Sequence, residues 1–377
     1  MEKVKLGDVC KVQGGYAFKS KEFQKDSIPI IRIGNIQDNE VEIDYNVCFT
    51  KEFLNKHPEF EIKYGDILIA MSGATVGKIG KYQNDTKALL NQRVGNFIVT
   101  EKLEKRYLYF LLQSPLFEKF ILNNAFGCAQ PNISSKQIEG FEFYNYDNVE
   151  QIEIANQLDK VQEIIDFRKK QIQELDELIK SQFVEMFGDP IQNDKNWDTD
   201  IINNVAPSQN YKGSFEDKVW LLNLDMVESN SGRIIDYVYE NINNIGNSTC
   251  TFNEENILYS KLRPYLNKVV IPNQKGYATS ELVPLRPNMD KINRYFLAYL
   301  LRSEQFVQYI SEKVAGAKMP RVSMDMFRKF NLIIPPIELQ NKFAEVVKQI
   351  DKQKFEIQKS LEETQKLQES LMNKYFG

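Results

Sequence analysis

The sequence predicts an α+β fold made of two copies of one unit, each a globular domain followed by a long helix. Two helical stretches carry an apolar seam with a period of 3.5 residues. The same residues recur along the chain at an offset of 189 or 190 positions. Short β-like runs, bounded by Gly, Asn and Asp, precede each helix. Together these features predict a pseudo-twofold internal repeat.

The first long helix is predicted at residues 150–188. Asn148, with Gln151 three residues later, can form a capping box, and Gly188-Asp189-Pro190 ends the helix because proline cannot continue it. Arg168 and Gln182 are the two polar residues of a seam with alternating spacings of four and three. Its apolar members are Ile154, Leu158, Val161, Ile165, Ile172, Leu175, Ile179 and Met186. A single helix cannot bury such a seam, so it needs a partner helix.

Residues 339–377 supply that partner. Their seam, 189 positions after the first, is Phe343, Val347, Ile350, Lys354, Ile357, Leu361, Thr364, Gln368, Leu371 and Tyr375. Identical residues recur at the same offset: Gln151 and Gln340, Ala155 and Ala344, Lys170 and Lys359, Glu174 and Glu363, Leu178 and Leu367, Ser181 and Ser370. Two unrelated amphipathic helices are the alternative, and the shared offset counts against it.

The repeat also covers the globular parts. We predict domains at 1–148 and 191–336, with spacer helices at 149–190 and 337–377. Strands are predicted at 28–33, 66–71 and 94–99, and helix at 105–122 with a break near Ser114-Pro115. The loop 127–134 (GCAQPNIS) corresponds to 316–323 (GAKMPRVS), and SGATVGK corresponds to LRPYLNK. The frame therefore repeats while the loops differ, which favours two different binding surfaces.

Composition narrows the function classes. The chain has 377 residues, 42% hydrophobic and 27% charged, with a net charge of −4, so any nucleic-acid surface must be local. Its four cysteines form no CxxC pair, which favours free thiols in a reducing cytosol over zinc or disulfides. No signal core and no run of 18 apolar residues is present, so we expect no membrane segment and a cytoplasmic location.

Catalytic chemistry has little support in the sequence. His57 is the single histidine, which excludes a serine triad or a histidine metal cluster. The segment 73–78 resembles a phosphate-binding loop but is one residue too short. Glu61-Ile62-Lys63 matches the end of a nuclease motif without an upstream acidic partner. We therefore expect no catalytic residue and no metal site.

Cations, amides and hydroxyls gather in the divergent loops instead. These side-chain types contact base edges and phosphates of DNA. The first copy offers Ser72, Thr75, Lys78, Arg93, Gln130, Asn132 and Lys136; the second offers Lys261, Arg263, Tyr265, Lys268, Lys318 and Arg321. Solvated surface residues are the alternative interpretation for each.

The chain resembles the specificity (S) subunit of type I restriction–modification systems. The resemblance rests on GDILIAMSGATVGKIG, LLNQRVG, the QPNIS loop and the helix ending in FVEMFGD, with second-copy counterparts ILYSKLRPYLNKV, GAKMPRVS and the helix ending in NKYFG. It covers almost the whole chain, through the order and duplication of these segments.

The resemblance implies that each globular domain is a target-recognition domain reading one half of a split double-stranded DNA sequence. The long helices would pack antiparallel as a coiled-coil spacer and dock two methyltransferase subunits. Those subunits would bring S-adenosylmethionine, and ATP-driven restriction subunits, with Mg²⁺, would join them; this chain would bind no cofactor itself. The recognised bases and the presence of a restriction subunit stay open.

Two alternatives from other classes remain at this point. One is a coiled-coil scaffold that joins partners without reading DNA. The other is a stand-alone nuclease that uses Glu61 and Lys63.

Overall fold

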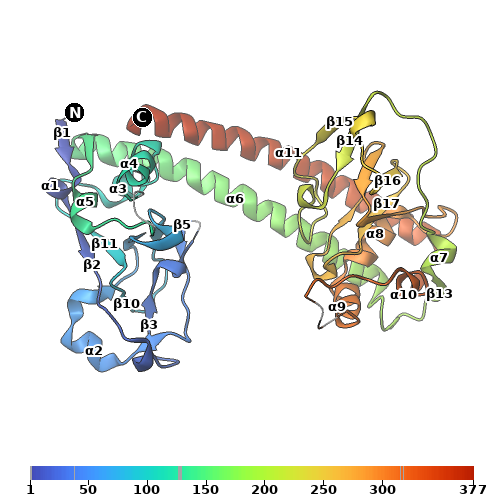
Figure 1. Ribbon diagram of the computed structural model, residues 1–377, viewed down its shortest axis with the longest axis horizontal. Coiled ribbons are helices and arrows are strands. Elements are labelled where there is room, and N and C mark those ends of the chain that lie inside the picture. The colour runs from blue at the N-terminus through green and yellow to red at the C-terminus, as the bar shows by residue number, and fades with distance from the viewer. Residues whose placement is uncertain (1, 38, 126–129, 315, 317) are drawn as a thin grey trace. The chain divides into compact units, whose positions relative to one another are not determined.

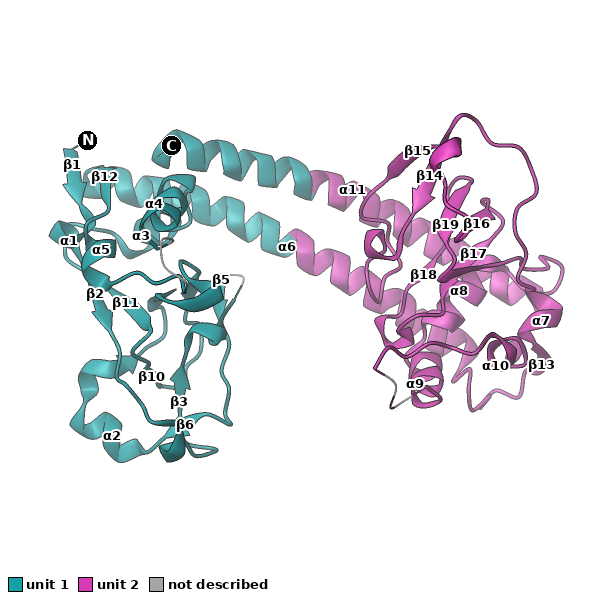
Figure 2. Cartoon of the chain, viewed as in Figure 1, with its two compact units in different colours: residues 1–167, 361–377 teal, residues 168–360 magenta. Residues whose placement is uncertain are grey.

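The computed structural model describes residues 2–37, 39–125, 130–314, 316 and 318–377. Its contacts divide the chain into two units, Met1–Phe167 with Leu361–Gly377, and Arg168–Ser360 (Figure 2). Each unit holds one globular repeat and a part of both long helices, α6 (Asn148–Phe187) and α11 (Ile337–Phe376), which are the longest ribbons in Figure 1. The predicted α+β fold with an internal repeat is confirmed.

The described residues of unit 1 form three sheets. The first is the antiparallel pair β1 (Glu2–Lys5) and β12 (Glu142–Asn145). A four-stranded sheet has the order β6 (Cys48–Phe49), β3 (Ile28–Ile31), β10 (Ala88–Leu90), β7 (Glu61–Ile62). The third sheet has the order β2 (Cys10–Gly14), β11 (Val94–Val99), β8 (Ile67–Ala70), β9 (Ile79–Lys81), β5 (Asn39–Val41), β4 (Ile36–Gln37). The three predicted strands correspond to β3, β8 and β11.

Unit 2 repeats this plan, with three strands where the third sheet of unit 1 has six. The antiparallel pair β13 (Asp198–Ile201) and β21 (Asn331–Ile334) is equivalent to the pair β1 and β12. One sheet has the order β15 (Val238–Asn241), β14 (Lys218–Leu222), β19 (Gly276–Thr279), β16 (Thr249–Phe252). Another has the order β18 (Val269–Val270), β17 (Ile257–Ser260), β20 (Leu282–Leu285). The parallel pairing of β3 with β10 recurs as β14 with β19, so the two folds agree even at an uncommon connection.

Helices complete each repeat. In unit 1 these are α1 (Leu6–Val9), α2 (Lys51–Lys56), α3 (Lys105–Leu111), α4 (Pro115–Ala125) and α5 (Ser135–Glu139). In unit 2 they are α7 (Ile202–Val205), α8 (Arg294–Arg302), α9 (Glu304–Glu312) and α10 (Met324–Arg328). The predicted break at Ser114 is confirmed. The buried Ser114 hydroxyl donates to Leu111 O at 2.6 Å, and Ser303 does the same to Leu300 O at 2.7 Å.

The predicted cap of α6 is wrong. Asp147 caps the helix: its carboxylate accepts from Glu150 N at 2.9 Å, while the Asn148 amide donates to Glu101 O at 2.9 Å. Gln151 is instead fully buried, accepting from Glu104 N at 2.8 Å and donating to Tyr146 O at 2.8 Å. The C-terminal prediction is confirmed, because Gly188 follows the last helical residue at φ +75°.

The buried glutamine is part of the repeat. Gln340 accepts from Asn293 N at 2.8 Å and donates to Pro335 O at 2.7 Å, as Gln151 does at the equivalent positions. Each glutamine ties the start of its long helix to the helix that follows the β-sheets of its own repeat. Buried amides with satisfied partners fix one geometry, since any other leaves polar groups unpaired.

Cores form within each unit around the long helices. In unit 1, Ile154, Ala155 and Leu158 of α6 and Phe376 of α11 pack in one hydrophobic cluster with the strands and α3. In unit 2, Phe183 and Phe187 of α6 join Phe343 of α11 against α8. The Phe187 ring lies 4.6 Å from Phe296, and the Phe376 ring lies 5.2 Å from Tyr107. Thus the C-terminal end of each long helix packs on the core of the other repeat.

Cys10, Cys48 and Cys250 are free thiols, and Cys128 lies outside the described residues. Burial raises the pKa of Cys10 to about 12 and that of Cys250 to about 11. These thiols are therefore poor nucleophiles at neutral pH. Within the described ranges, none of the helices combines the length and hydropathy needed to cross a lipid bilayer.

Candidate nucleic-acid interface

Three loops meet beside the end of β8 in unit 1. Residues 72–78 follow β8, residues 91–93 precede β11, and residues 130–134 lead into α5. Backbone hydrogen bonds join them: Gly73 N donates to Pro131 O at 3.0 Å, and Met71 N donates to Arg93 O at 2.9 Å. An isolated antiparallel bridge between Ser72 and Asn132 completes the junction. Predicted site residues that lie far apart in the sequence are therefore neighbours here.

The corresponding loops of unit 2 meet in the same way beside the end of β17. Arg263 N donates to Pro320 O at 2.8 Å, Lys261 N donates to Glu281 O at 3.0 Å, and Leu262 bridges Arg321. The two units thus carry one backbone frame. Because backbone bonds build the frame, its side chains are free to differ between the copies.

One frame position has a left-handed backbone in both copies. Gly73 occupies it in unit 1 with φ +78°, and Arg263 occupies it in unit 2 with φ +49°. Glycine takes this conformation freely, whereas a long side chain pays about 1 kcal/mol or more. Arginine at such a position therefore destabilises the loop. Burial of its side chain does not offset this strain, because the Arg263 side chain is exposed.

The predicted residues of unit 1 separate into two groups. The exposed ones are Lys78, Arg93, Gln130, Asn132 and Lys136. Ser72 is buried, and its hydroxyl has no hydrogen-bond partner among the residues that the structure describes. Thr75 donates its hydroxyl hydrogen to Ile33 O at 3.3 Å. Ser72 and Thr75 thus face the protein, so a role in DNA binding would need them to turn outward.

Unit 2 shows the same division. The exposed residues are Arg263, Tyr265, Lys318 and Arg321, and Lys261 is half-buried. The Lys268 ammonium donates to Leu224 O at 2.7 Å, and burial lowers its pKa below the ordinary value. Lys268 therefore stabilises the loop from within. Arg321 forms an ion pair of 2.6 Å with Glu281.

Sequence reasoning missed Glu281. It lies between β19 and β20, where Arg93 lies between β10 and β11 in the first copy. The offset between these two residues is 188, whereas the preceding loop repeats at 190 and the following helices at 189, so a fixed offset of 189 pairs Arg93 with Leu282 instead. The strand register makes the equivalence visible, since Glu281 O and Arg93 O accept the same backbone bond.

The surroundings of Glu61 do not support the nuclease alternative. Its carboxylate forms an ion pair of 2.6 Å with Lys87 and lies 3.5 Å from Lys63, and the interaction with Lys87 is the main reason that its pKa is lowered. Within the described part of the chain, no group of three His, Cys, Asp or Glu residues is arranged to hold a metal ion. Glu61 thus lies among lysines, as in an ordinary ion-pair cluster.

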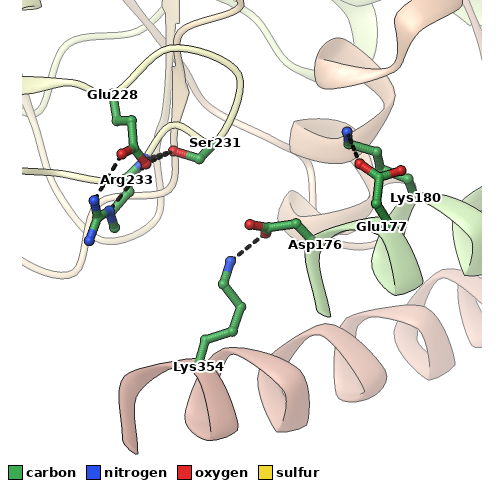
Figure 3. Close-up of polar contacts among 7 residues, drawn as sticks. All are labelled: Asp176, Glu177, Lys180, Glu228, Ser231, Arg233 and Lys354. Atoms are coloured by element: carbon green, nitrogen blue, oxygen red, sulfur yellow. Dashed lines mark hydrogen bonds and ion pairs between the residues drawn. The ribbon is translucent and has the colours of Figure 1, made fainter. Parts of the chain in front are cut away.

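The long helices run antiparallel where they pack inside each unit. In unit 1, Gln368 donates to Gln162 at 2.7 Å and Tyr375 donates to Gln157 at 2.7 Å. In unit 2, the Lys354 ammonium lies 2.5 Å from Asp176, and Arg168 donates to Ser360 O at 2.6 Å (Figure 3 shows Lys354 and Asp176). As the residue number on α6 rises, the number of its partner on α11 falls, so the two helices run in opposite directions within each unit. These polar pairs set the register of the two helices.

The proposed seam residues differ in burial. Leu158, Val161, Ile165, Val347, Ile350 and Leu361 are buried. Ile172, Leu175 and Ile357, nearer the middle of the helices, are half-buried. In that region of unit 2 a groove lies between the helices, lined by Leu175, Leu178 and Ile357 together with polar side chains.

One set of exposed helix residues is identical in the two repeats, and two of its members, Glu174 and Leu178, also line this groove. Lys170, Glu174, Leu178 and Ser181 of α6 are exposed, and so are the identical Lys359, Glu363, Leu367 and Ser370 of α11. Spacings of four, four and three place each set on one helix face. Leu178 is 45% exposed and Leu367 is 51% exposed. We call each set a repeat stripe.

Two stretches of the chain, residues 1–177 and 201–368, match the family model described as Type I restriction modification DNA specificity domain. The chain is 30% identical over 184 residues to the type I restriction enzyme MjaVIII specificity subunit of Methanocaldococcus jannaschii, a match spanning 48% of this chain and 43% of that protein. It is 21% identical over 399 residues to the MjaIX specificity subunit of the same organism, across 98% of this chain and 91% of that protein.

Among solved structures, the chain is similar to the type I restriction–modification S subunit from M. genitalium. The TM-score is 0.59 at 14% identity, covering 100% of this chain and 96% of that one. At this identity the likeness shows the fold alone, and it agrees with two β-rich domains joined to two long helices.

Proposed function

Because this chain belongs to the family of type I restriction–modification DNA specificity subunits, we propose that each of its two repeats reads one half of a bipartite DNA target. The observation that carries this proposal is the shared loop frame with different side chains. Gly73 faces Pro131 as Arg263 faces Pro320, while the neighbouring exposed side chains are Asn132 in one copy and Arg321 in the other. One frame with two sets of polar side chains suits two different half-sites.

The exposed side chains of the two loop sets can make the contacts that reading requires. Asparagine and glutamine can pair with adenine through two hydrogen bonds, and arginine can pair with guanine in the same way. We therefore assign base contacts to Gln130, Asn132 and Arg321, and phosphate contacts to Lys78, Lys136, Arg263 and Lys318. The net charge of −4 means that attraction to DNA comes from these local cations.

The repeat stripes support a second part of the proposal, that two identical methyltransferase subunits dock on the long helices. A partner that binds twice needs the same surface twice, and the stripes present Lys, Glu, Leu and Ser in the same order on α6 and α11. Exposed leucines between charged residues are suited to such an interface. The methyltransferases would supply S-adenosylmethionine, and restriction subunits would supply ATP- and Mg²⁺-dependent steps.

Methylation-sensitive sequencing tests this function. Cells that express the chain with its methyltransferase should carry methylated bases in one motif made of two short half-sites and an unspecified spacer. Deleting the gene for this chain should abolish that methylation. Methylation that continues without this chain, or a motif with a single uninterrupted site, would contradict two-domain reading and favour a scaffold role.

A further inference from the structure

We propose that Glu281 is a positioning residue that orients Arg321 for base reading in the second half-site. This inference rests on the proposed DNA-reading function and adds to it a residue outside the predicted set. Glu281 lies in the turn between β19 and β20, and its backbone carbonyl accepts from Lys261 N at 3.0 Å. Its side chain is therefore held at the junction where the loops of unit 2 meet.

The ion pair leaves most of Arg321 available. One guanidinium nitrogen of Arg321 lies 2.6 Å from Glu281 Oε1, and 57% of the Arg321 side chain is exposed, against 21% of Glu281. A guanidinium has five N–H donors in a planar fork. A carboxylate that holds one nitrogen of this fork restricts where the side chain can point, and the remaining donors can then donate twice to guanine O6 and N7.

The pair is poorly explained as a stability device. Glu281 Oε2 is buried and has no hydrogen-bond partner among the described residues. A buried polar atom without a partner lowers the free energy of unfolding. An ion pair with an exposed arginine contributes too little stability to offset that loss. A destabilising carboxylate beside an exposed arginine is instead expected in a binding site where the arginine side chain must be held in one orientation.

The first copy supports the same interpretation through its differences. The equivalent of Glu281 is Arg93, and the equivalent of Arg321 is Asn132, as the shared backbone bonds and bridges establish. The frame therefore folds without an acid at this position. Unit 2, which has the arginine Arg321, also has the acid Glu281. Without that acid, the Arg321 guanidinium would be attracted to any DNA phosphate.

The test uses the full chain with its methyltransferase, bound to duplexes with the target sequence or single-base changes at several salt concentrations. Glu281→Gln keeps the shape but removes the charge that holds Arg321. We expect about a tenfold loss of discrimination at one base pair of the second half-site. Binding to non-target duplex should become tighter, with a salt slope steeper by about one, because a freed arginine can contact a phosphate.

Glu255→Gln is the matched control. Glu255 pairs with Arg286 and precedes β17, whereas Lys261 and the loop junction follow the other end of that strand. This variant changes the net charge of the domain by the same amount. It should leave base discrimination at its original value, which separates positioning from a general gain of positive charge.

A double variant completes the cycle. In the Arg321→Ala background, Glu281→Gln should leave base preference unchanged, since the carboxylate acts through the arginine. A further change in preference would mean that Glu281 contacts DNA directly, and the positioning role would fall. If Arg321→Ala relaxes base preference while Glu281→Gln alters neither preference nor salt slope, the inference is wrong and DNA reading stands. If the unaltered complex shows no sequence selectivity, the proposed function itself fails.

Discussion

Gly73 and Arg263 occupy the same left-handed position of the repeated loop frame, and each donates its backbone N–H to the carbonyl of the equivalent proline, Pro131 or Pro320. The first copy uses the residue that this conformation favours. The second copy keeps an exposed arginine there, against the backbone preference. This contrast separates what the frame needs from what the binding surface needs.

Arg263→Gly should therefore remove a DNA contact without harming the fold. We expect a free energy of unfolding within about 1 kcal/mol of the original, since relief of the strained backbone offsets the extra freedom of glycine in the unfolded chain. Affinity for all duplexes should fall, with a salt slope shallower by about one phosphate contact. Thermal unfolding and duplex titrations of the methyltransferase complex measure both. Unchanged affinity and slope would place the DNA on another face.

Burial of the helix seam predicts that an acid within it disrupts assembly. Leu158 is fully buried and Ile350 is 5% exposed, so Leu158→Asp or Ile350→Asp leaves an unpaired charge in a core at a cost of several kcal/mol. Unfolding temperature should drop sharply, and methyltransferase should no longer co-purify. Lys160→Asp, on an exposed position of the same helix, is the control and should assemble normally. Normal assembly of both seam variants would contradict the packing described for these residues.

The repeat stripes predict two equivalent and separable docking sites. Leu178→Asp or Leu367→Asp should each reduce the complex from two methyltransferase subunits to one, and the double variant should bind none. Both leucines are exposed, so the helices should keep their unfolding temperature. Native mass spectrometry of the purified complexes gives the subunit count.

Phe355→Asp is the control for the stripes. Phe355 is 66% exposed on α11, but its equivalent in the first repeat is Asp166, so it is not part of the shared surface. This variant should retain two subunits. Loss of both subunits from either single stripe variant would mean that docking is not independent at the two sites.

The duplicated frame predicts that the two halves of the target change independently. Replacing residues 1–148 with the same domain of a relative should alter one half of the methylated sequence and leave the other half and the spacer intact. Inserting a few residues within 150–188 should instead change the spacer, as expected if this helix sets the separation of the half-sites. Sequencing of methylated genomic DNA gives each motif, and a domain exchange that altered both halves would rule out independent reading.

The sequence alone determined the features that depend on local periodicity. The spacing of Leu158, Val161 and Ile165 identified a long helix with one apolar face, and Gly188 marked its end, because such patterns involve residues within a few turns of one another. The repeat was equally visible, since identical residues at a constant offset need no knowledge of contacts. Even so, the cap was assigned to Asn148 where Asp147 forms it, because neighbouring residues with similar side chains compete for that position.

Tertiary structure alone decided which side chains face outward and which segments meet. Ser72 and Asn132 are neighbours through a bridge between distant loops, and no local pattern records that pairing. Folding turned the Ser72 hydroxyl inward and bonded Lys268 to Leu224, although both residues belong to loops rich in polar side chains. Glu281 emerged only from the strand register, since the second copy is two residues shorter between Arg263 and Glu281 than the first copy is between Gly73 and Arg93. Long-range backbone hydrogen bonds, which local composition does not encode, determine which side chains of these loops are exposed and available for binding.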